Sequence, residues 1–256
     1  MYKYSVLTYN FGGYEIMREV CGWQSDVEYI YVTDDKTLTS STWNIVYDES
    51  LDGKDIFDKC YSVRFNPFKY CSTDICVRID ASIQLLQPID KIINDFVSKD
   101  FDIAFMPHHC FDNISDEYRA WCTFRGYDEQ KAFDNTKFFH KCGYDTDNYK
   151  GLYTGGIIIQ KRNKKNEDIN RMTYSFLKYL GDENAIERND QIVFTFVINN
   201  FFENDLKIMP ISASLVESDT LILMVHGRDD LRVFNRNPVY YDKAFVFNKE
   251  TELYKY

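Results

Sequence analysis

Short apolar runs typical of β-strands alternate with helix-like segments along most of this chain. Strands are expected at 4–9, 27–32, 76–80 and 156–160, and several of these runs end in polar residues. Alternation of this kind predicts an α/β fold with a mixed sheet flanked by helices, not a sandwich or a bundle. Because open α/β sheets bind ligands beyond the carboxyl ends of their strands, the polar strand ends are the first candidates for a functional site.

Helix signals fill the intervals between the expected strands. Proline in a first turn and glycine after a last turn are typical helix boundaries. The expected helices cover 14–21, Pro88 to Phe96, two helices within 115–141 broken near Gly126, 167–180, and 189 to about 202. The remaining expected strands are 43–47, 102–106, 206–209 and 221–225.

The size and charge of the chain limit the classes of protein it can belong to. With 256 residues and 45% apolar residues, it can bury the core of a single domain covering 1–256. A net charge of -10 argues against nucleic acid or anionic membrane as a general partner. No apolar run reaches about 18 residues and the start lacks a signal-peptide pattern, so we expect a cytoplasmic protein without a transmembrane segment.

The cysteines and the motif search exclude several kinds of site. Seven cysteines form no C-x-x-C pair and have no zinc-finger spacing, so free thiols are expected and structural zinc is not. The sequence contains no G-x-x-x-x-G-K-[ST], G-x-G-x-x-G, H-E-x-x-H or G-x-S-x-G motif. Readings as a P-loop, dinucleotide-binding, metalloprotease or α/β-hydrolase protein are therefore disfavoured.

The strand expected at 76–80 carries the most concentrated group of polar side chains. If this strand continues, Arg78, Asp80 and Ser82 share one face. A carboxylate there can hold a divalent cation on a diphosphate, and a guanidinium can bind a phosphate oxygen. The alternative is that Asp80 ends the strand and caps the following turn.

Three other segments place polar groups at the ends of expected elements. Thr33 and Asp34 can accept hydrogen bonds from a nucleoside, or can lie in a solvated turn. Gly155 and Gly156 allow close approach of a ligand or simply form a turn. In the segment 189–191, the Asp190 carboxylate can reach sugar hydroxyls or cap the backbone N–H groups of its helix.

Two residues near the C-terminal end of the sequence are further candidates. His226 follows an apolar run and can ligate a metal or contact a phosphate. Arg228 can neutralise charge on a leaving group. A loop position without function is the alternative for both.

The order of these segments resembles the GT-A class of glycosyltransferases, in particular the glycosyltransferase-like family of plant mucilage-related and bacterial polysaccharide-locus proteins. The segments 10–14 and 31–35 look like the N-x-G-x-Y-D turn and the nucleotide-side strand end of this family. The segments 78–83, 108–117, 152–159 and 188–191 are similar to its acidic strand and to its H-x-x-R-x-C-I-x-x-E, E-T-G-I-I-I and R-D-Q motifs.

The resemblance implies a GT-A-like, Rossmann-type sheet that binds a nucleotide-diphospho-sugar donor. It implies a nucleotide-binding part at about 1–110 and an acceptor- and sugar-binding part at about 111–256. The donor-binding residues expected on this basis are Tyr9, Asn10, Thr33, Asp34, Asp80, Ser82, His108, Gly155, Gly156 and Arg228.

Asp190, Gln191 and Arg78 are the expected catalytic residues. The activity expected is transfer of a hexose to a hydroxyl of a glycan or related acceptor, with retention of configuration, in polysaccharide biosynthesis. Asp190 stabilises the positive charge on the sugar in a retaining reaction, or acts as general base in an inverting one. The alternative is a GT-A scaffold that binds a nucleotide or glycan without turnover.

If the site holds a divalent cation, Mn²⁺ or Mg²⁺, its expected ligands are Asp80 and His226. The GT-A acidic motif is Asp-x-Asp, and Ser82 stands at the position of its second carboxylate. That change removes an oxygen anion that hard cations prefer. Without a metal, Arg78 or Arg228 is expected to stabilise the departing diphosphate.

Overall fold

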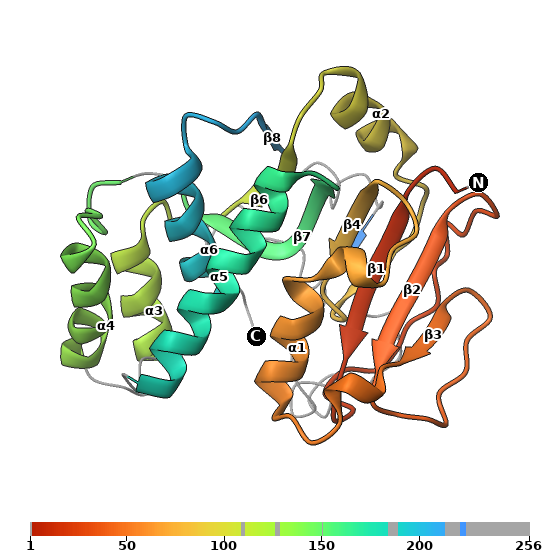
Figure 1. Ribbon diagram of the computed structural model, residues 1–256, viewed down its shortest axis with the longest axis horizontal. Coiled ribbons are helices and arrows are strands. Elements are labelled where there is room, and N and C mark those ends of the chain that lie inside the picture. Colours follow the sequence, from red (N-terminus) through yellow and green to blue (C-terminus); the bar gives the residue numbers. More distant parts are fainter. Residues whose placement is uncertain are drawn as a thin grey trace.

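The computed structural model describes residues 2–108, 111–125, 129–149, 151–183, 189–212 and 221–223. A central sheet of seven strands has helices packed against it (Figure 1). Its strands are β1 (Ser5–Asn10), β2 (Glu28–Thr33), β3 (Asn44–Tyr47), β4 (Ile75–Ile79), β6 (Ile103–Pro107), β7 (Tyr153–Lys161) and β8 (Ile208–Pro210). The separate strands β5 (Ile83–Leu85) and β9 (Leu221–Leu223) pair with each other.

The strand order of the sheet is β3-β2-β1-β4-β7-β6-β8, and its strands are parallel except for β7. β7 comes from the second half of the chain and lies antiparallel between β4 and β6. The expected α/β architecture with a mixed sheet is therefore confirmed.

The helices are α1 (Ile56–Arg64), α2 (Asp90–Ser98), α3 (Ile114–Arg125), α4 (Glu129–Lys141), α5 (Lys164–Glu183) and α6 (Asp190–Val197). Short helical turns occur at Glu49–Leu51, Pro67–Lys69 and Ile198–Phe202. In Figure 1, α1, α5 and α6 cross in front of the sheet, and α3 and α4 lie beyond its β6 side.

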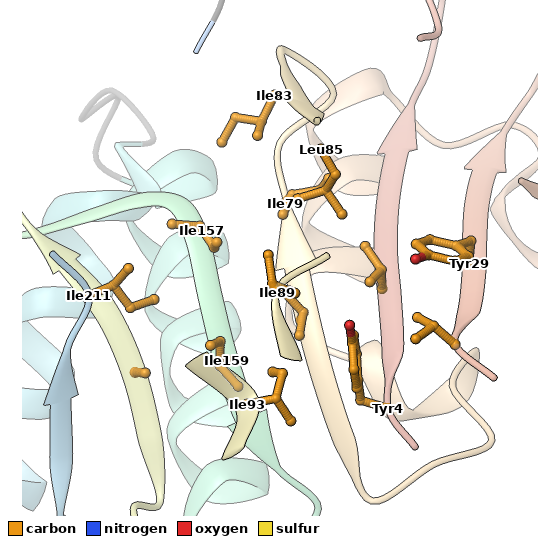
Figure 2. Packing of buried hydrophobic residues seen from close by; sticks show 14 of the residues in the cluster. Tyr4, Tyr29, Ile79, Ile83, Leu85, Ile89, Ile93, Ile157, Ile159 and Ile211 are labelled. Atoms are coloured by element: carbon orange, nitrogen blue, oxygen red, sulfur yellow. The ribbon is translucent and has the colours of Figure 1, made fainter. Parts of the chain in front are cut away.

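One face of the sheet packs against α2 and the segment before it. Side chains alternate along a strand, so Ile79 of β4 and Ile157 of β7 point to the same face. There they join Ile89, Ile93 and Phe96 in a continuous apolar cluster, part of which is drawn in Figure 2. Burying this cluster fixes the register of β4 beside β7, because a slip of one residue would turn every side chain over.

The opposite face of the sheet is covered by the other helices. Ile158 of β7 and Phe105 of β6 pack here against residues of α3, α4, α5 and α6. Leu7 and Cys76 contribute to a neighbouring apolar cluster that also includes Val63 of α1. Arg78 lies on this same face, since it alternates with Val77 and Ile79 along β4.

The helix expected at 14–21 does not form. Asn10 holds the segment in a loop, because its side chain donates to the carbonyl of Glu15 and accepts from the amide of that residue. Further along, the amide of Val20 donates to Thr42 and the indole of Trp43 donates to the carbonyl of Arg18. Side chains thus satisfy the backbone groups that a helix would have paired internally.

The region 115–141 contains the two expected helices, α3 and α4. The side chain of Asn113 caps α3 by accepting from the amide of Asp116. Helix α1 was not expected from the sequence; it begins after Asp55, which caps it by accepting from the amide of Asp58. The part of the chain that the structure describes contains no helix long and apolar enough to cross a bilayer.

Candidate functional site

The carboxyl ends of the parallel strands lie along one edge of the sheet, together with the start of the antiparallel β7. Asn10 and Thr33 end β1 and β2 in register with each other. Tyr153, the first residue of β7, pairs with Pro107, the last residue of β6. The segments that the sequence singled out around 10, 33, 80, 108 and 155 therefore meet at one edge.

The strand order reverses at β1. From β1 the chain builds β2 and β3 on one side, and it then returns to place β4 on the other side. In open α/β sheets, ligands bind outside the strand ends at this kind of switch point. Tyr9 stands near the end of β1, and Asp80 directly follows β4, so these two residues lie on either side of the switch point.

Arg64, the last residue of α1, supplies a positive charge at the switch point. Its Nη1 lies 2.6 Å from Oδ2 of Asp190 and 3.5 Å from Oδ1 of Asp80, and it donates to the Tyr9 hydroxyl at 3.3 Å. Its Nη2 donates to the carbonyl of Gly155 at 2.8 Å. One guanidinium thus joins residues of β1, β7, α6 and the turn after β4. We call Arg64, Asp80 and Asp190 the Arg64 cluster.

The Arg64 cluster is held together by charge. Burial by itself lowers the pKa of Arg64, but the negative charges of Asp190 and Asp80 outweigh it and raise this pKa well above its ordinary value. Oδ2 of Asp190, which forms the ion pair with Arg64, is buried. The Asp190 side chain as a whole is 21% exposed, so part of it can be reached by a ligand.

The Arg64 side chain leaves no room for a Cβ atom at Gly155. A Cβ atom at Gly155 would lie 1.9 Å from Nη2 of Arg64, which is far inside van der Waals contact. At Gly156 the nearest atom to an added Cβ would be Cδ1 of Ile83 at 3.3 Å, with Oδ2 of Asp80 at 4.0 Å. The first glycine makes room for the guanidinium, and the second faces the turn that carries Asp80.

Arg78 lies behind the Arg64 cluster, not at its surface. It is 1% exposed, and its Nη1 donates to the backbone carbonyl of Arg64 at 2.8 Å. Burial and the charge of Arg64 lower the pKa of Arg78 to about 10. Its guanidinium also packs on the ring of Phe65, 5.8 Å from the centroid. In this position Arg78 supports the end of α1 and leaves Arg64 as the guanidinium beside the carboxylates.

Asp34 lies at the end of β2 and pairs with a different cation of the same helix. Its two carboxylate oxygens accept from Nζ of Lys59 at 2.8 Å and from the amide of Gly12 at 2.9 Å. These bonds overcome the effect of burial and lower the pKa of Asp34. Lys59 precedes Arg64 by five residues on α1, so one helix provides cations to both sides of β1.

The charges of Asp34, Asp80 and Asp190 all affect the pKa of one thiol of α1. Burial raises the pKa of Cys60 to about 12, and the charges of Asp190, Asp80 and Asp34 add to this effect against the opposing charge of Arg64. Asp80 and Asp190 both pair with Arg64, whereas Asp34 pairs with Lys59.

A second polar group begins at the end of β6. Nε2 of His108 lies 3.4 Å from Oε2 of Glu117, in the first turn of α3. Oε1 of Glu117 accepts from Nε2 of Gln191 at 3.3 Å, and Oε1 of Gln191 accepts from the amide of Gly155 at 3.1 Å. Burial raises the pKa of Glu117 to about 7, against a lowering hydrogen bond from Asn189.

The other expected residues have mainly local roles in the structure. Asn10 is 8% exposed and binds the backbone of Glu15, and Thr33 accepts from the amide of Asp35. Asn189 caps α6 by accepting from the amide of Ile192, so the capping role left open for Asp190 is filled by Asn189.

The shared face expected for Arg78, Asp80 and Ser82 does not form, because β4 ends at Ile79. The amide of Ile83 donates to the carbonyl of Asp80 and closes a turn there, and Ser82 is buried at 4% exposure. Because of this turn, the chain leaves the strand before Asp80 and Ser82 can take positions on the same face as Arg78. His226 and Arg228 lie outside the described residues.

The described residues at this edge do not form a ligand set that fits a divalent cation, and the expected ligand His226 lies outside them. Hard cations require several oxygen ligands, and a group of three potential ligands that could hold a metal does not occur within the described residues. The place between Asp80 and Asp190 is taken by the guanidinium of Arg64. The positive charge next to these carboxylates therefore comes from the chain itself.

Arg64, Lys59 and Glu117 were not identified as site residues from the sequence. Arg64 and Lys59 belong to the unexpected helix α1, in which Ile56 and Phe57 are more than half exposed while Arg64 is buried. Glu117 lies in an expected helix. Its spacing of three residues from the apolar Ile114 did not indicate that the Glu117 side chain is buried. A signal was present in the segment 108–117, where a histidine and a glutamate mark both ends of one motif.

Comparison with known proteins finds likenesses among solved structures. No family model and no curated protein matches the sequence. Among solved structures, the chain is similar to the apo form of mouse xyloside xylosyltransferase 1, with 10% sequence identity and a TM-score of 0.49. The match covers 82% of this chain and 86% of the mouse chain.

Proposed function

We propose that this protein is a glycosyltransferase that moves a hexose from a nucleotide-diphospho-sugar to a hydroxyl of a glycan or related acceptor. The observation that supports this most is the Arg64 cluster at the strand-order switch point. The side chain of Asp190, which is 21% exposed, can contact the donor sugar, and the fixed charge of Arg64 favours the negative charge that develops on a leaving diphosphate. We place this activity in polysaccharide biosynthesis in the cytoplasm.

In this proposal the two parts of the chain bind different parts of the substrates. Residues 1–110 bind the nucleotide, with Thr33 and Asp34 near the nucleoside and Asp80 near the diphosphate. Residues 111–256 bind the sugar and the acceptor. The position of Asp34 and Asp80 on opposite sides of β1 supports this order, since a nucleotide lying across the switch point passes both strand ends.

We infer retention of configuration at the sugar. Asp190 forms an ion pair with Arg64, and a carboxylate in that position stabilises the positive charge that develops on the sugar ring. As a general base it would have to accept a proton and give up its ion pair with Arg64, which is costly for a largely buried guanidinium. The paired state of Asp190 therefore favours charge stabilisation over proton transfer.

Asp190→Asn is expected to lower kcat by about 100-fold, because removing one preorganised charge from an active site typically costs that much. The donor KM should change by only a few-fold, since the amide keeps the size and the acceptor oxygen. The measurement is release of nucleoside diphosphate and formation of glycoside, by mass spectrometry, with UDP- and GDP-hexoses and a panel of glycans. Asp95→Asn, on the surface of α2 and 53% exposed, is the control. Turnover of Asp190→Asn at the wild-type rate would overturn the role of Asp190.

The second candidate is a binding module on the same scaffold that holds a nucleotide or glycan without turnover. It is favoured by Ser82 in place of a carboxylate and by the pairing of both Asp80 and Asp190 with Arg64. Calorimetric binding of a nucleotide-sugar without nucleotide release, with all donors and glycans tested, would establish this candidate instead.

A further inference from the structure

Glu117 and His108, the second of which was expected to bind the donor, form a polar pair outside the Arg64 cluster. His108 follows the last residue of β6, and Glu117 lies in the first turn of α3. Their side chains are 9% and 13% exposed, so the pair is largely buried but not sealed from a ligand. Glu117 lies beside the imidazole of His108, in contrast to Asp80 and Asp190, which share an arginine.

The contacts of His108 determine where its proton lies. The amide of Phe111 donates to Nδ1 of His108 at 3.0 Å, so Nδ1 acts as an acceptor and the ring proton is on Nε2. Nε2 faces Glu117, and the ring stacks on Phe111 with centroids 5.4 Å apart, which fixes the plane of the imidazole. A neutral His108 therefore points an N–H at the carboxylate.

Glu117 retains capacity to accept another hydrogen bond. Gln191 and Asn189 donate to its side chain, and His108 lies next to its Oε2. An ionised carboxylate offers about four acceptor positions, so one remains after these three partners. Neutral donors surround the carboxylate, and a hydroxyl group is the kind of ligand that can complete such a set.

The pair is connected to the Arg64 cluster by a short chain of hydrogen bonds. Gln191 bonds Glu117 with its amide nitrogen and the Gly155 N–H with its oxygen, and the Gly155 carbonyl accepts from Arg64. Gln191 also follows Asp190 in the first turn of α6. A ligand at Glu117 is therefore next to the place where the proposed function puts the donor sugar.

We propose that Glu117 and His108 bind the reacting hydroxyl of an acceptor sugar, with Glu117 accepting a hydrogen bond from that hydroxyl. The inference rests on the proposed function and names the acceptor side of the same site. The charge of the pair indicates which of the two substrates it binds. A carboxylate without arginine or lysine repels a diphosphate and suits a neutral polyhydroxyl ligand, whereas the anionic part of the donor lies on the Arg64 side.

The first test compares Glu117→Gln with wild type, using methyl glycosides of glucose, galactose and mannose as acceptors. We expect the acceptor KM to rise at least tenfold in Glu117→Gln, while nucleotide release without acceptor and the Kd of the donor stay within about twofold. Asp116→Asn removes a neighbouring, 46% exposed carboxylate of α3 and is the matched control. An unchanged acceptor KM, or a donor Kd that weakens in parallel, would overturn the inference.

A second measurement does not depend on turnover or on the folding of a variant. The chain has four histidines, so the imidazole resonances of wild type can be assigned by NMR and followed while the methyl glycosides are added. We expect the His108 resonances to shift with at least one glycoside, whether or not the donor reacts. If glycosides leave His108 unshifted, the acceptor site is not here even if donor turnover is observed. If His108 shifts but no donor is turned over, the proposed function fails and the glycoside site stands.

Discussion

Gly155→Ala should reduce turnover by about 100-fold, while Gly156→Ala, one residue further along β7, should cost less than tenfold. The reason is the place that each new methyl group would occupy. At Gly155 it would lie 1.9 Å from Nη2 of Arg64, so the guanidinium or the strand has to move. Displacing an active-site group by about 1 Å is enough to cost about 100-fold in rate.

The comparison isolates the steric effect. Gly155 and Gly156 are both outside the left-handed backbone region, so alanine introduces no backbone strain at either position. At Gly156 the methyl group would meet the end of the flexible Ile83 side chain at 3.3 Å, which can shift by a few tenths of an ångström. Steady-state kinetics and the melting temperature of both variants provide the measurement. Equal losses of activity in the two variants would show that Arg64 does not need its present position.

Arg64→Met should unfold about 3 kcal/mol more easily than wild type and should lose activity. Methionine fills a similar volume but leaves Asp80 and Asp190 without their cation, and breaking a buried ion pair from one side costs about this much. The same change at Arg171, whose side chain is 72% exposed beside Asp168, should cost less than about 0.5 kcal/mol.

The double variant Arg64→Met with Asp190→Asn distinguishes charge from packing. If the loss comes from uncompensated carboxylates, removing one of them should recover part of the stability without recovering activity. Denaturant unfolding of the two single variants and the double variant measures this coupling. Stability losses that simply add would mean that Arg64 contributes by packing, and the electrostatic account of the cluster would be wrong.

Much of the sheet could be predicted because its strands are short apolar runs buried on both faces. All six residues of β1 are buried, and five of the six in β2, so their pattern is unmistakable in the sequence. The polar strand ends were also predictable, since Asp34 and Asp80 directly follow such runs. The positions of the expected ligands along one edge follow from the parallel arrangement of these strands.

Helix α1 could not be predicted because its pattern contradicts the usual rule. Ile56 and Phe57 are 51% and 58% exposed, whereas Arg64 is 9% exposed. The buried arginine is stabilised here by Asp190 and Asp80, which come from distant parts of the chain. Periodicity reports local amphipathic structure and does not reveal a charge that is compensated by long-range contacts. Arg64, the residue at the centre of the proposed site, could therefore not be identified from the sequence.

For the segment from 14 to 21, the sequence predicted a helix that does not form. Its apolar spacing favours a helix, and Ile16 is nevertheless 51% exposed in an irregular segment. The bonds from Asn10 and Thr42 that hold this loop depend on residues outside the window in which periodicity is measured. Tertiary hydrogen bonds override a weak helix pattern in this case.

The most direct test of the Arg64 cluster as the donor site is a calorimetric titration of UDP- and GDP-hexoses into wild type and Arg64→Lys, with a chelator present. Lysine keeps the charge but, as a single point charge, cannot bridge Asp80, Asp190 and Gly155 together. We predict that wild type binds one of these donors without any divalent cation, and that Arg64→Lys binds it at least tenfold more weakly. Binding that requires Mn²⁺ or Mg²⁺, or an equal Kd in the two proteins, would contradict the account.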